Sequence, residues 1–281
     1  GISVGGLPLN KKHFSLLPSV DHICATHNLE KNAFSKGQPE WGKELAEDLL
    51  QVIEKHGADK IAAFITEPLA GSTGVLVPPK GYLERIREIC TQNDILLIFD
   101  EVITGFGRLG APFAAQYFDV EPDMITCAKG LTSGTIPMGA VIVKKETYDA
   151  YQDGDAKSID LFHGYTYSAH PMAAAALIAT LDVYSEDQLF EYIADISSYW
   201  EEAVHSLKGT DHVIDIRNLG LVAGIEMSPR EGSPGTRGYD VFTDGFHNHN
   251  LLLRITGDTL ALSPPLIVEK DHIDQIVETL K

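Results

Sequence analysis

Short apolar runs that end in a single charged residue constrain this chain most strongly. Ile95–Phe99 runs directly into Asp100, and Met124–Ala128 runs directly into Lys129. Apolar runs of this length with β-branched and aromatic residues predict buried strands. A charge delivered at the end of a buried strand costs free energy unless it has a partner. We therefore expect Asp100 and Lys129 to have a chemical role at one edge of a sheet.

A lysine amine and a carboxylate are the pair that pyridoxal phosphate requires. The amine forms a Schiff base, and the carboxylate keeps the pyridine nitrogen protonated so that the ring accepts electrons. Such a lysine must lose its proton from an intrinsic pKa of about 10.4, which partial burial assists. A solvated lysine and a capping aspartate are the ordinary alternatives. Glu101 adjoins Asp100, and strand alternation points the two in opposite directions, so either one fits the carboxylate role.

Strand and helix patterns alternate over the first part of the chain, which predicts an α/β fold with a mostly parallel sheet and helices on both faces. Ligands bind beyond the carboxyl ends of such strands. Glu67 follows the first candidate strand, so we expect it to meet Asp100 and Lys129 at one rim. The candidate strands are 61–66, 95–99, 124–127 and 139–143, and the candidate helices are 41–56, 80–92 and 114–118.

The second part of the chain reads as a smaller α+β domain. A helix over 171–184 begins with a proline, and Ser185–Asp187 is the expected boundary, giving a large domain over 1–184 and a small one over 185–281. Beyond the boundary we expect helices over 188–208 and 271–280, strands over 213–216 and 221–227, and a loop over 231–238.

Composition narrows the class of protein. The net charge of −18 over 281 residues argues against nucleic acid or an anionic membrane as the main partner. Cys24, Cys90 and Cys127 are few and scattered, which indicates a reducing compartment, and we expect a cytoplasmic location. No run has the length of a membrane span or the pattern of a signal peptide. Gly1–Gly6 reads like the interior of a domain, so we expect an upstream segment to be missing.

Two patterns suggest other chemistry. Gly105–Gly110 matches the dinucleotide-binding pattern G-x-G-x-x-G, but it follows acidic Asp100 and Glu101, and we interpret it as a tight turn. Histidines with nearby acidic or cysteine residues raise the question of a metal site. Their spacings fit no ligand pattern, so we expect no metal; they are Asp21, His22, Cys24, His27, His247 and His249.

Three longer motifs resemble the class III pyridoxal-phosphate aminotransferases, and the resemblance covers nearly the whole chain. They are Glu67–Gly74, Ile98–Arg108 and Ala128–Leu131. Within the family the chain is most similar to the ω-amino acid–pyruvate (β-alanine–pyruvate) group, to which His163–Pro171 and Leu253–Asp258 add support.

The resemblance implies a fold-type-I transferase with pyridoxal 5′-phosphate as cofactor. Lys129 would be the Schiff-base lysine that also moves the proton, and Asp100 would pair with the pyridinium nitrogen. Val102 would pack on the ring, and Glu67 would support the cofactor site. Thr166 would bind the cofactor phosphate of the neighbouring subunit, which implies a homodimer or homotetramer.

Substrate choice rests on two further positions. Arg254 resembles the mobile arginine that receives the substrate carboxylate, and a guanidinium fork suits that task; a surface ion pair is the ordinary alternative. Ornithine- and GABA-type relatives carry a glutamate where this chain has Ser72. This departure favours transamination from an ω-amino acid or amine, such as β-alanine, to a keto acid such as pyruvate.

Other functions stay open at this point. An aminomutase or a decarboxylating relative uses the same lysine and aspartate, the glycine pattern allows a nucleotide-binding dehydrogenase, and truncation allows a catalytically silent fragment. The family's upstream region supplies a phosphate-binding helix end and a ring that stacks on the cofactor. Since this chain lacks them, we expect weak or no cofactor binding and an exposed sheet surface if it acts alone.

Overall fold

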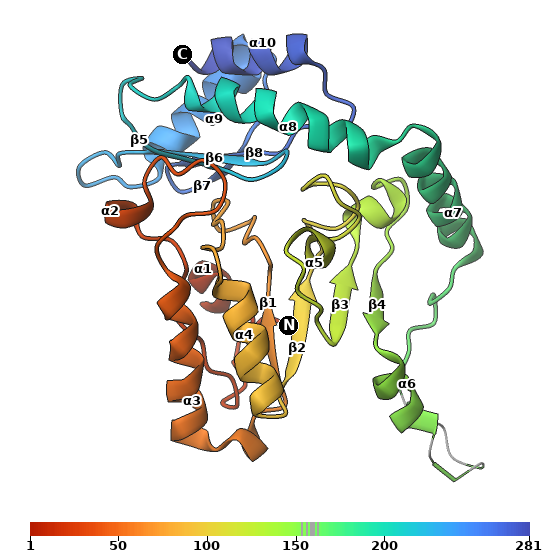
Figure 1. The fold of residues 1–281 in the computed structure, drawn as a ribbon. Coiled ribbons are helices and arrows are strands. Elements are labelled where there is room, and N and C mark those ends of the chain that lie inside the picture. The colour runs from red at the N-terminus through yellow and green to blue at the C-terminus, as the bar shows by residue number, and fades with distance from the viewer. Residues whose placement is uncertain (153, 156, 158–160, 162) are drawn as a thin grey trace.

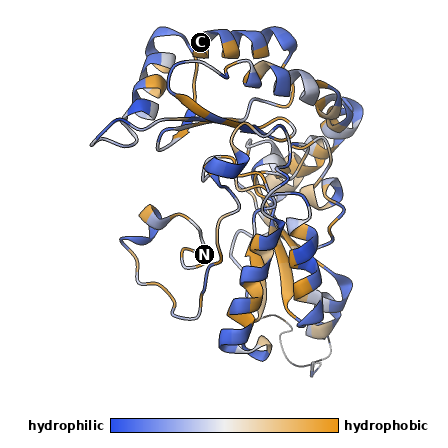
Figure 2. Ribbon diagram, turned by 60° about the vertical axis from the view of Figure 1, so that its left-hand side comes forward, coloured by the Kyte–Doolittle hydropathy of each residue, from blue (hydrophilic) through white to orange (hydrophobic). Residues whose placement is uncertain are grey.

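Two four-stranded sheets organise the chain, as Figure 1 shows. The computed structural model describes residues 1–152, 154–155, 157, 161 and 163–281. The first sheet has the strand order β1-β2-β3-β4, and the second, above it in Figure 1, has the order β5-β6-β8-β7. Hydrophobic residues concentrate on the strands of both sheets, whereas the N-terminal segment stands apart from them (Figure 2).

The first sheet confirms the α/β fold class. β1 (Ala63–Thr66), β2 (Leu96–Asp100) and β3 (Met124–Cys127) run parallel, and β4 (Ala140–Val143) pairs antiparallel with β3. The connection from β3 to β4 contains the 3₁₀ turn η3 (Lys129–Thr132) and no crossover α-helix. A parallel return needs such a crossover, so the chain comes back in the opposite direction.

The two faces of the first sheet differ. Leu97 and Phe99 of β2 are fully buried in a cluster that includes apolar residues of α3 (Asp48–His56) and α4 (Tyr82–Gln92). The opposite face is open to solvent, because Ile65 and Leu96 are each 38% exposed and Val141 is 62% exposed. Strand alternation puts Asp100 on this open face, which matches the exposed sheet surface expected from the sequence.

The second sheet is antiparallel throughout and consists of β5 (Val213–Asn218), β6 (Ala223–Met227), β7 (Arg254–Thr256) and β8 (Thr259–Leu262). Ile216, Ile225 and Leu260 share one face, which packs on α8 (Leu189–His205) and α10 (Lys270–Leu280). The other face turns toward the first sheet, because Ala261 on that side packs into the first sheet's core.

Some helices and strands were not predicted from the sequence, or were predicted with a different structure. α9 (Thr236–Asn248) lies partly where a loop was expected, and a Cβ on its Gly238 would collide with the Gly257 carbonyl oxygen. Glycine has a low helix propensity, so Gly238, which lets α9 pack closely, also weakens the helical pattern in the sequence. The expected helix over 41–56 is a 3₁₀ turn, η1 (Lys43–Glu47), followed by α3. β7, β8 and α6 (Lys145–Gln152) were also missed.

The remaining elements connect or flank the sheets. They are α1 (Pro8–Lys11), α2 (Leu29–Asn32), η2 (Ala58–Lys60), α5 (Ala114–Tyr117) and α7 (Pro171–Glu186). α7 ends near the expected boundary, and Gln188 has a φ of +49° before α8 begins. The division at residue 185 stays a prediction. In the described part of the chain, every helix is too short or too polar to cross a membrane.

Gly224 provides a test of how closely the two sheets pack. A Cβ at this position would lie 2.7 Å from the Gly74 carbonyl oxygen and 3.2 Å from Val75. Since overpacking of a rigid backbone contact costs about 1–3 kcal/mol, Gly224→Ala should lower the free energy of unfolding by that amount in urea titration. Gly139→Ala is the control, because its nearest neighbour would lie 3.6 Å away. Equal stability of both variants would contradict this packing.

Candidate active site

Three side chains meet at the carboxyl ends of the parallel strands. Glu67 follows β1, Asp100 ends β2 and Lys129 follows β3, in strands whose ends are aligned by the pairing of Thr66 with Phe99. Burial raises the pKa of Glu67 and the Gly71 amide lowers it; Asp100 raises it further and Lys129 lowers it. Asp100 and Lys129 therefore both lie within electrostatic range of Glu67, at the edge where α/β sheets bind ligands.

The structure separates the roles of Asp100 and Glu101. Glu101 is fully buried and accepts hydrogen bonds from the amides of Ala114 (2.6 Å) and Ala115 (2.9 Å) and from the hydroxyl of Thr104 (2.9 Å). Burial raises its pKa, and these three donors lower it. Asp100 is half-buried and points the other way. Glu101 therefore holds α5 in place, whereas Asp100 is the carboxylate that a ligand can reach.

Lys129 sits on an unusual piece of backbone. Its φ is +44°, in the left-handed region, and such strain in a non-glycine residue persists only where surrounding structure imposes it. Gly130 supplies that support, because a Cβ there would lie 2.8 Å from Phe106 and its carbonyl accepts the Tyr184 hydroxyl at 2.7 Å. Lys129 itself is exposed, so the partial burial anticipated for its side chain is not found in this chain.

The glycine pattern beside the site forms turns, as the sequence analysis interpreted it. Gly107 has a φ of +104° and leaves room for Phe190, and Gly110 has a φ of +81° and lies against Ala194. The next helix, α5, begins only at Ala114. A dinucleotide-binding pattern requires a helix that opens within the glycines, so this segment lacks the required strand–turn–helix geometry.

Arg254 lies on the face of β7 that is directed toward the first sheet. Ile255 packs against the apolar core of the second sheet, so its neighbours Arg254 and Thr256 point the other way. The Thr256 hydroxyl donates to the Ser72 carbonyl at 2.8 Å, and the Gly71 amide donates to Glu67 at 3.0 Å. Arg254 is exposed and forms no ion pair among the described residues.

The other two predicted residues differ in their surroundings. Val102 is half-buried, and its amide donates to Asp100 Oδ1 at 3.2 Å, which places it beside Glu67, Asp100 and Lys129, together called the strand-end group. Thr166 lies in an exposed turn before α7, on a segment separate from Glu67, Asp100 and Lys129. Its expected role in a neighbouring subunit stays a prediction.

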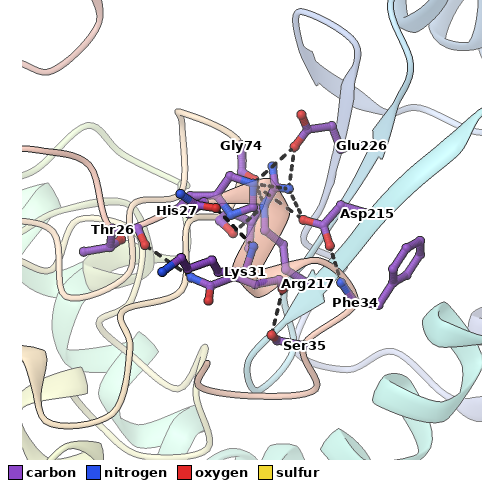
Figure 3. Close-up of polar contacts among 12 residues, drawn as sticks. Thr26, His27, Lys31, Phe34, Ser35, Gly74, Asp215, Arg217 and Glu226 are labelled. Atoms are coloured by element: carbon purple, nitrogen blue, oxygen red, sulfur yellow. Dashed lines mark hydrogen bonds and ion pairs between the residues drawn. The ribbon is translucent and has the colours of Figure 1, made fainter. Parts of the chain in front are cut away.

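A buried ionic network between the two sheets was missed from the sequence (Figure 3). Arg217 Nη1 lies 2.6 Å from Asp215 and 2.6 Å from Glu226, and its Nε donates to the carbonyls of Gly74 (2.9 Å) and Val75 (3.1 Å). The only sequence signal is the alternation of charged residues in β5.

His27 completes this network. Its Nε2 lies 3.7 Å from each of Asp215 and Glu226, so these three residues could hold a cation. The guanidinium of Arg217 takes the place of that cation, because its Nη1 contacts both carboxylates.

Acid should weaken the fold through His27. Burial and then the charge of Arg217 lower the pKa of His27 below its usual 6.5, so its stabilising contribution exists above that value and is lost as the pH falls through the lowered folded-state pKa. The melting temperature of wild type should fall as the pH drops below about 6.5. His27→Gln should flatten this slope relative to His13→Gln, a surface control. Identical slopes in both variants would rule out this role for His27.

Exchanging each carboxyl for an amide should distinguish Asp100 from Glu101. Glu101→Gln sets an NH₂ group against amide donors, which should lower the free energy of unfolding by about 1–3 kcal/mol. Asp100→Asn keeps the oxygen that accepts from Val102 and should change stability by less than about 0.5 kcal/mol. Urea unfolding of both variants measures the difference. Greater destabilisation by Asp100→Asn would reverse the assignment.

Comparisons with known proteins agree with this geometry. The family described as aminotransferase class-III matches residues 8–281. An omega-aminotransferase from Caulobacter vibrioides is 60% identical over 282 residues, and a beta-alanine–pyruvate aminotransferase from Pseudomonas aeruginosa is 45% identical over 288 residues. The omega transaminase from Pseudomonas jessenii, solved in complex with PMP, is 33% identical with a TM-score of 0.89 over 99% of this chain.

The chain spans only part of these relatives. It covers 64% of the Caulobacter protein, 63% of the Pseudomonas aeruginosa protein and 63% of the Pseudomonas jessenii structure, while each alignment includes 99% or more of this chain. Because sequence, fold and strand-end geometry agree over nearly all its residues, this chain belongs to the class-III aminotransferase family.

Proposed function

We propose that this chain carries the catalytic residues of a pyridoxal-phosphate-dependent ω-aminotransferase. The reaction moves an amino group from an ω-amino acid or amine, such as β-alanine, to a keto acid such as pyruvate. The observation that carries the proposal is the juxtaposition of Glu67, Asp100 and Lys129 at neighbouring strand ends, with Asp100 left accessible because Glu101 caps α5. The relatives named for ω-amino acid and β-alanine transamination support the choice of substrates.

The donor set at this edge suits pyridoxal phosphate, which supplies a conjugated ring that accepts electrons from the substrate carbon when bound. Lys129 provides the amine of the strand-end group. Asp100 provides the carboxylate that holds a proton on a ring nitrogen, and Val102, directly beside it, offers an apolar surface for the ring. The left-handed backbone at Lys129 sets the direction in which its side chain leaves the main chain.

The proton chemistry is assigned to Lys129, and carboxylate binding to Arg254. With the cofactor bound, the Lys129 amine would remove a proton from the substrate carbon and return it two atoms away, as a 1,3-proton shift. Arg254 receives the carboxylate of the keto acid through two parallel hydrogen bonds. Ser72 lies next to β7, because its carbonyl accepts the hydrogen bond from Thr256. A serine offers no carboxylate that could neutralise Arg254, so Arg254 must turn away when a donor lacks an α-carboxylate.

A second copy of the chain belongs to this proposal. Thr166 stands between Tyr165, which is 75% exposed, and Tyr167, which is 80% exposed. Large aromatic side chains at this level of exposure are typical of surfaces that another protein covers. We assign Thr166 to the cofactor phosphate of a neighbouring subunit, in a homodimer or homotetramer whose other partners are small amines and keto acids.

Chemical trapping tests the cofactor and the lysine together. The protein is mixed with pyridoxal phosphate, reduced with borohydride and mapped by peptide mass spectrometry. We expect a pyridoxyl adduct on Lys129, because Lys129 follows β3 at the strand ends where Asp100 ends β2 and Glu67 follows β1. Lys129→Ala should lose both the adduct and turnover, while Lys60→Ala, a surface change, should keep them. No adduct on Lys129 in this chain or in a form extended to the length of its relatives, or activity of Lys129→Ala within about tenfold of wild type, would refute the assignment.

Arg254 should matter for one half-reaction only. Arg254→Ala removes the guanidinium that binds the keto-acid carboxylate, so kcat/KM for pyruvate should fall by about 100-fold. The reaction with a simple amine that carries no carboxylate should change by less than about threefold. Stopped-flow spectra of the separate half-reactions measure both values. Equal losses in the two half-reactions would show that Arg254 has a structural role instead.

A further inference from the structure

We propose that Thr256 is a positioning residue for Arg254, and that Arg217 secures the same loop from a second point. Together they set how far Arg254 stands from the strand-end group, and hence how well a keto-acid carboxylate is held. The proposal rests on the function proposed above, and it concerns the backbone loop Ser72–Val75 between the two sheets.

The first contact lies on the strand that carries Arg254. Thr256 is two residues further along β7, on the same face, and its hydroxyl donates to the Ser72 carbonyl at 2.8 Å. Within the described residues, β7 is an edge strand that pairs only with β8, through three residue pairs of which Arg254 with Ala261 lies farthest from the turn between the two strands. So short an edge strand depends on contacts outside its own sheet for a fixed position.

The loop that Thr256 reaches is tied to the strand-end group. The Gly71 amide donates to Glu67 at 3.0 Å, and a Cβ on Gly71 would lie 2.6 Å from Ile103, the neighbour of Val102. Ala70 and Leu76 exchange two backbone hydrogen bonds, of 3.1 and 2.9 Å, which close the loop. The Ser72 carbonyl is therefore a fixed point relative to Glu67.

The second contact comes from β5, at the opposite edge of the second sheet from β7. Arg217 of β5 donates to the carbonyls of Gly74 and Val75, at 2.9 and 3.1 Å, and Figure 3 shows it reaching toward Gly74. Its guanidinium is held in turn by Asp215 and Glu226, both at 2.6 Å. The loop is thus fixed to the second sheet at two points, one beside Arg254 and one at the opposite edge strand.

This arrangement predicts an effect that depends on the substrate. A bidentate guanidinium–carboxylate pair is sensitive to small displacements, and misplacement by 1 Å can cost about 100-fold in rate. An amine without a carboxylate makes no use of Arg254. Loss of the Thr256 hydroxyl should therefore impair keto-acid binding and leave the amine reaction nearly unchanged.

The test compares Thr256→Val, which keeps the shape and removes the donor, with Thr256→Ser, which keeps the donor. In the cofactor-loaded protein, Thr256→Val should raise KM for pyruvate about tenfold and change kcat and the simple-amine reaction by less than about twofold. Thr256→Ser should restore KM to within about twofold of wild type. Hydrogen exchange without cofactor or substrate should show faster exchange of the 72–75 amides in Thr256→Val only.

The outcomes separate this inference from the proposed function. An unchanged KM for pyruvate in Thr256→Val, or equal losses for pyruvate and amine, would overturn the positioning role while the aminotransferase stands. Failure of Thr256→Ser to restore KM would also overturn it, because the shared hydroxyl would then be irrelevant. Wild-type protein that reacts with neither substrate would overturn the proposed function, and this inference with it.

Discussion

The burial of one guanidinium between the two sheets is the interaction on which the arrangement depends. Arg217 is 4% exposed, and a charge removed from water to this extent costs several kcal/mol unless it is paired and fully hydrogen-bonded. Asp215 and Glu226 accept from its Nη1 and neutralise it, and the carbonyls of Gly74 and Val75 accept from its Nε. Because these partners come from both sides, the charge is satisfied only when the second sheet sits correctly on the loop.

A second arginine makes the reciprocal connection. Arg108, in the turn beside the strand-end group, donates to the carbonyls of Leu221 (3.0 Å) and Pro264 (2.7 Å), which lie just beyond the ends of strands of the second sheet. It has no carboxylate partner among the described residues, and burial lowers its pKa to about 10. Each part of the chain therefore sends one guanidinium into backbone carbonyls of the other. Backbone carbonyls are fixed in space, so these contacts determine relative position more sharply than flexible surface ion pairs would.

The strand-end group could be predicted because its signal is local. An apolar run followed at once by a single charge identifies both a strand and its end, and this pattern alone predicts that Asp100 and Lys129 lie at the same rim. The choice between Asp100 and Glu101 could not be made in this way. It depends on the amides of Ala114 and Ala115, more than ten residues away, which make Glu101 a buried cap.

The sequence by itself determined the α/β class, the family resemblance and the residues offered for catalysis, since periodicity and motifs are properties of neighbouring residues. Tertiary structure alone decided the antiparallel return of β4, the helix α9 with its buried glycine, and the network around Arg217. These features depend on contacts between segments that are distant in sequence, such as Arg217 with Gly74, or on how a connection folds back. No local pattern contains such information, because the free energy that favours them appears only when the segments meet.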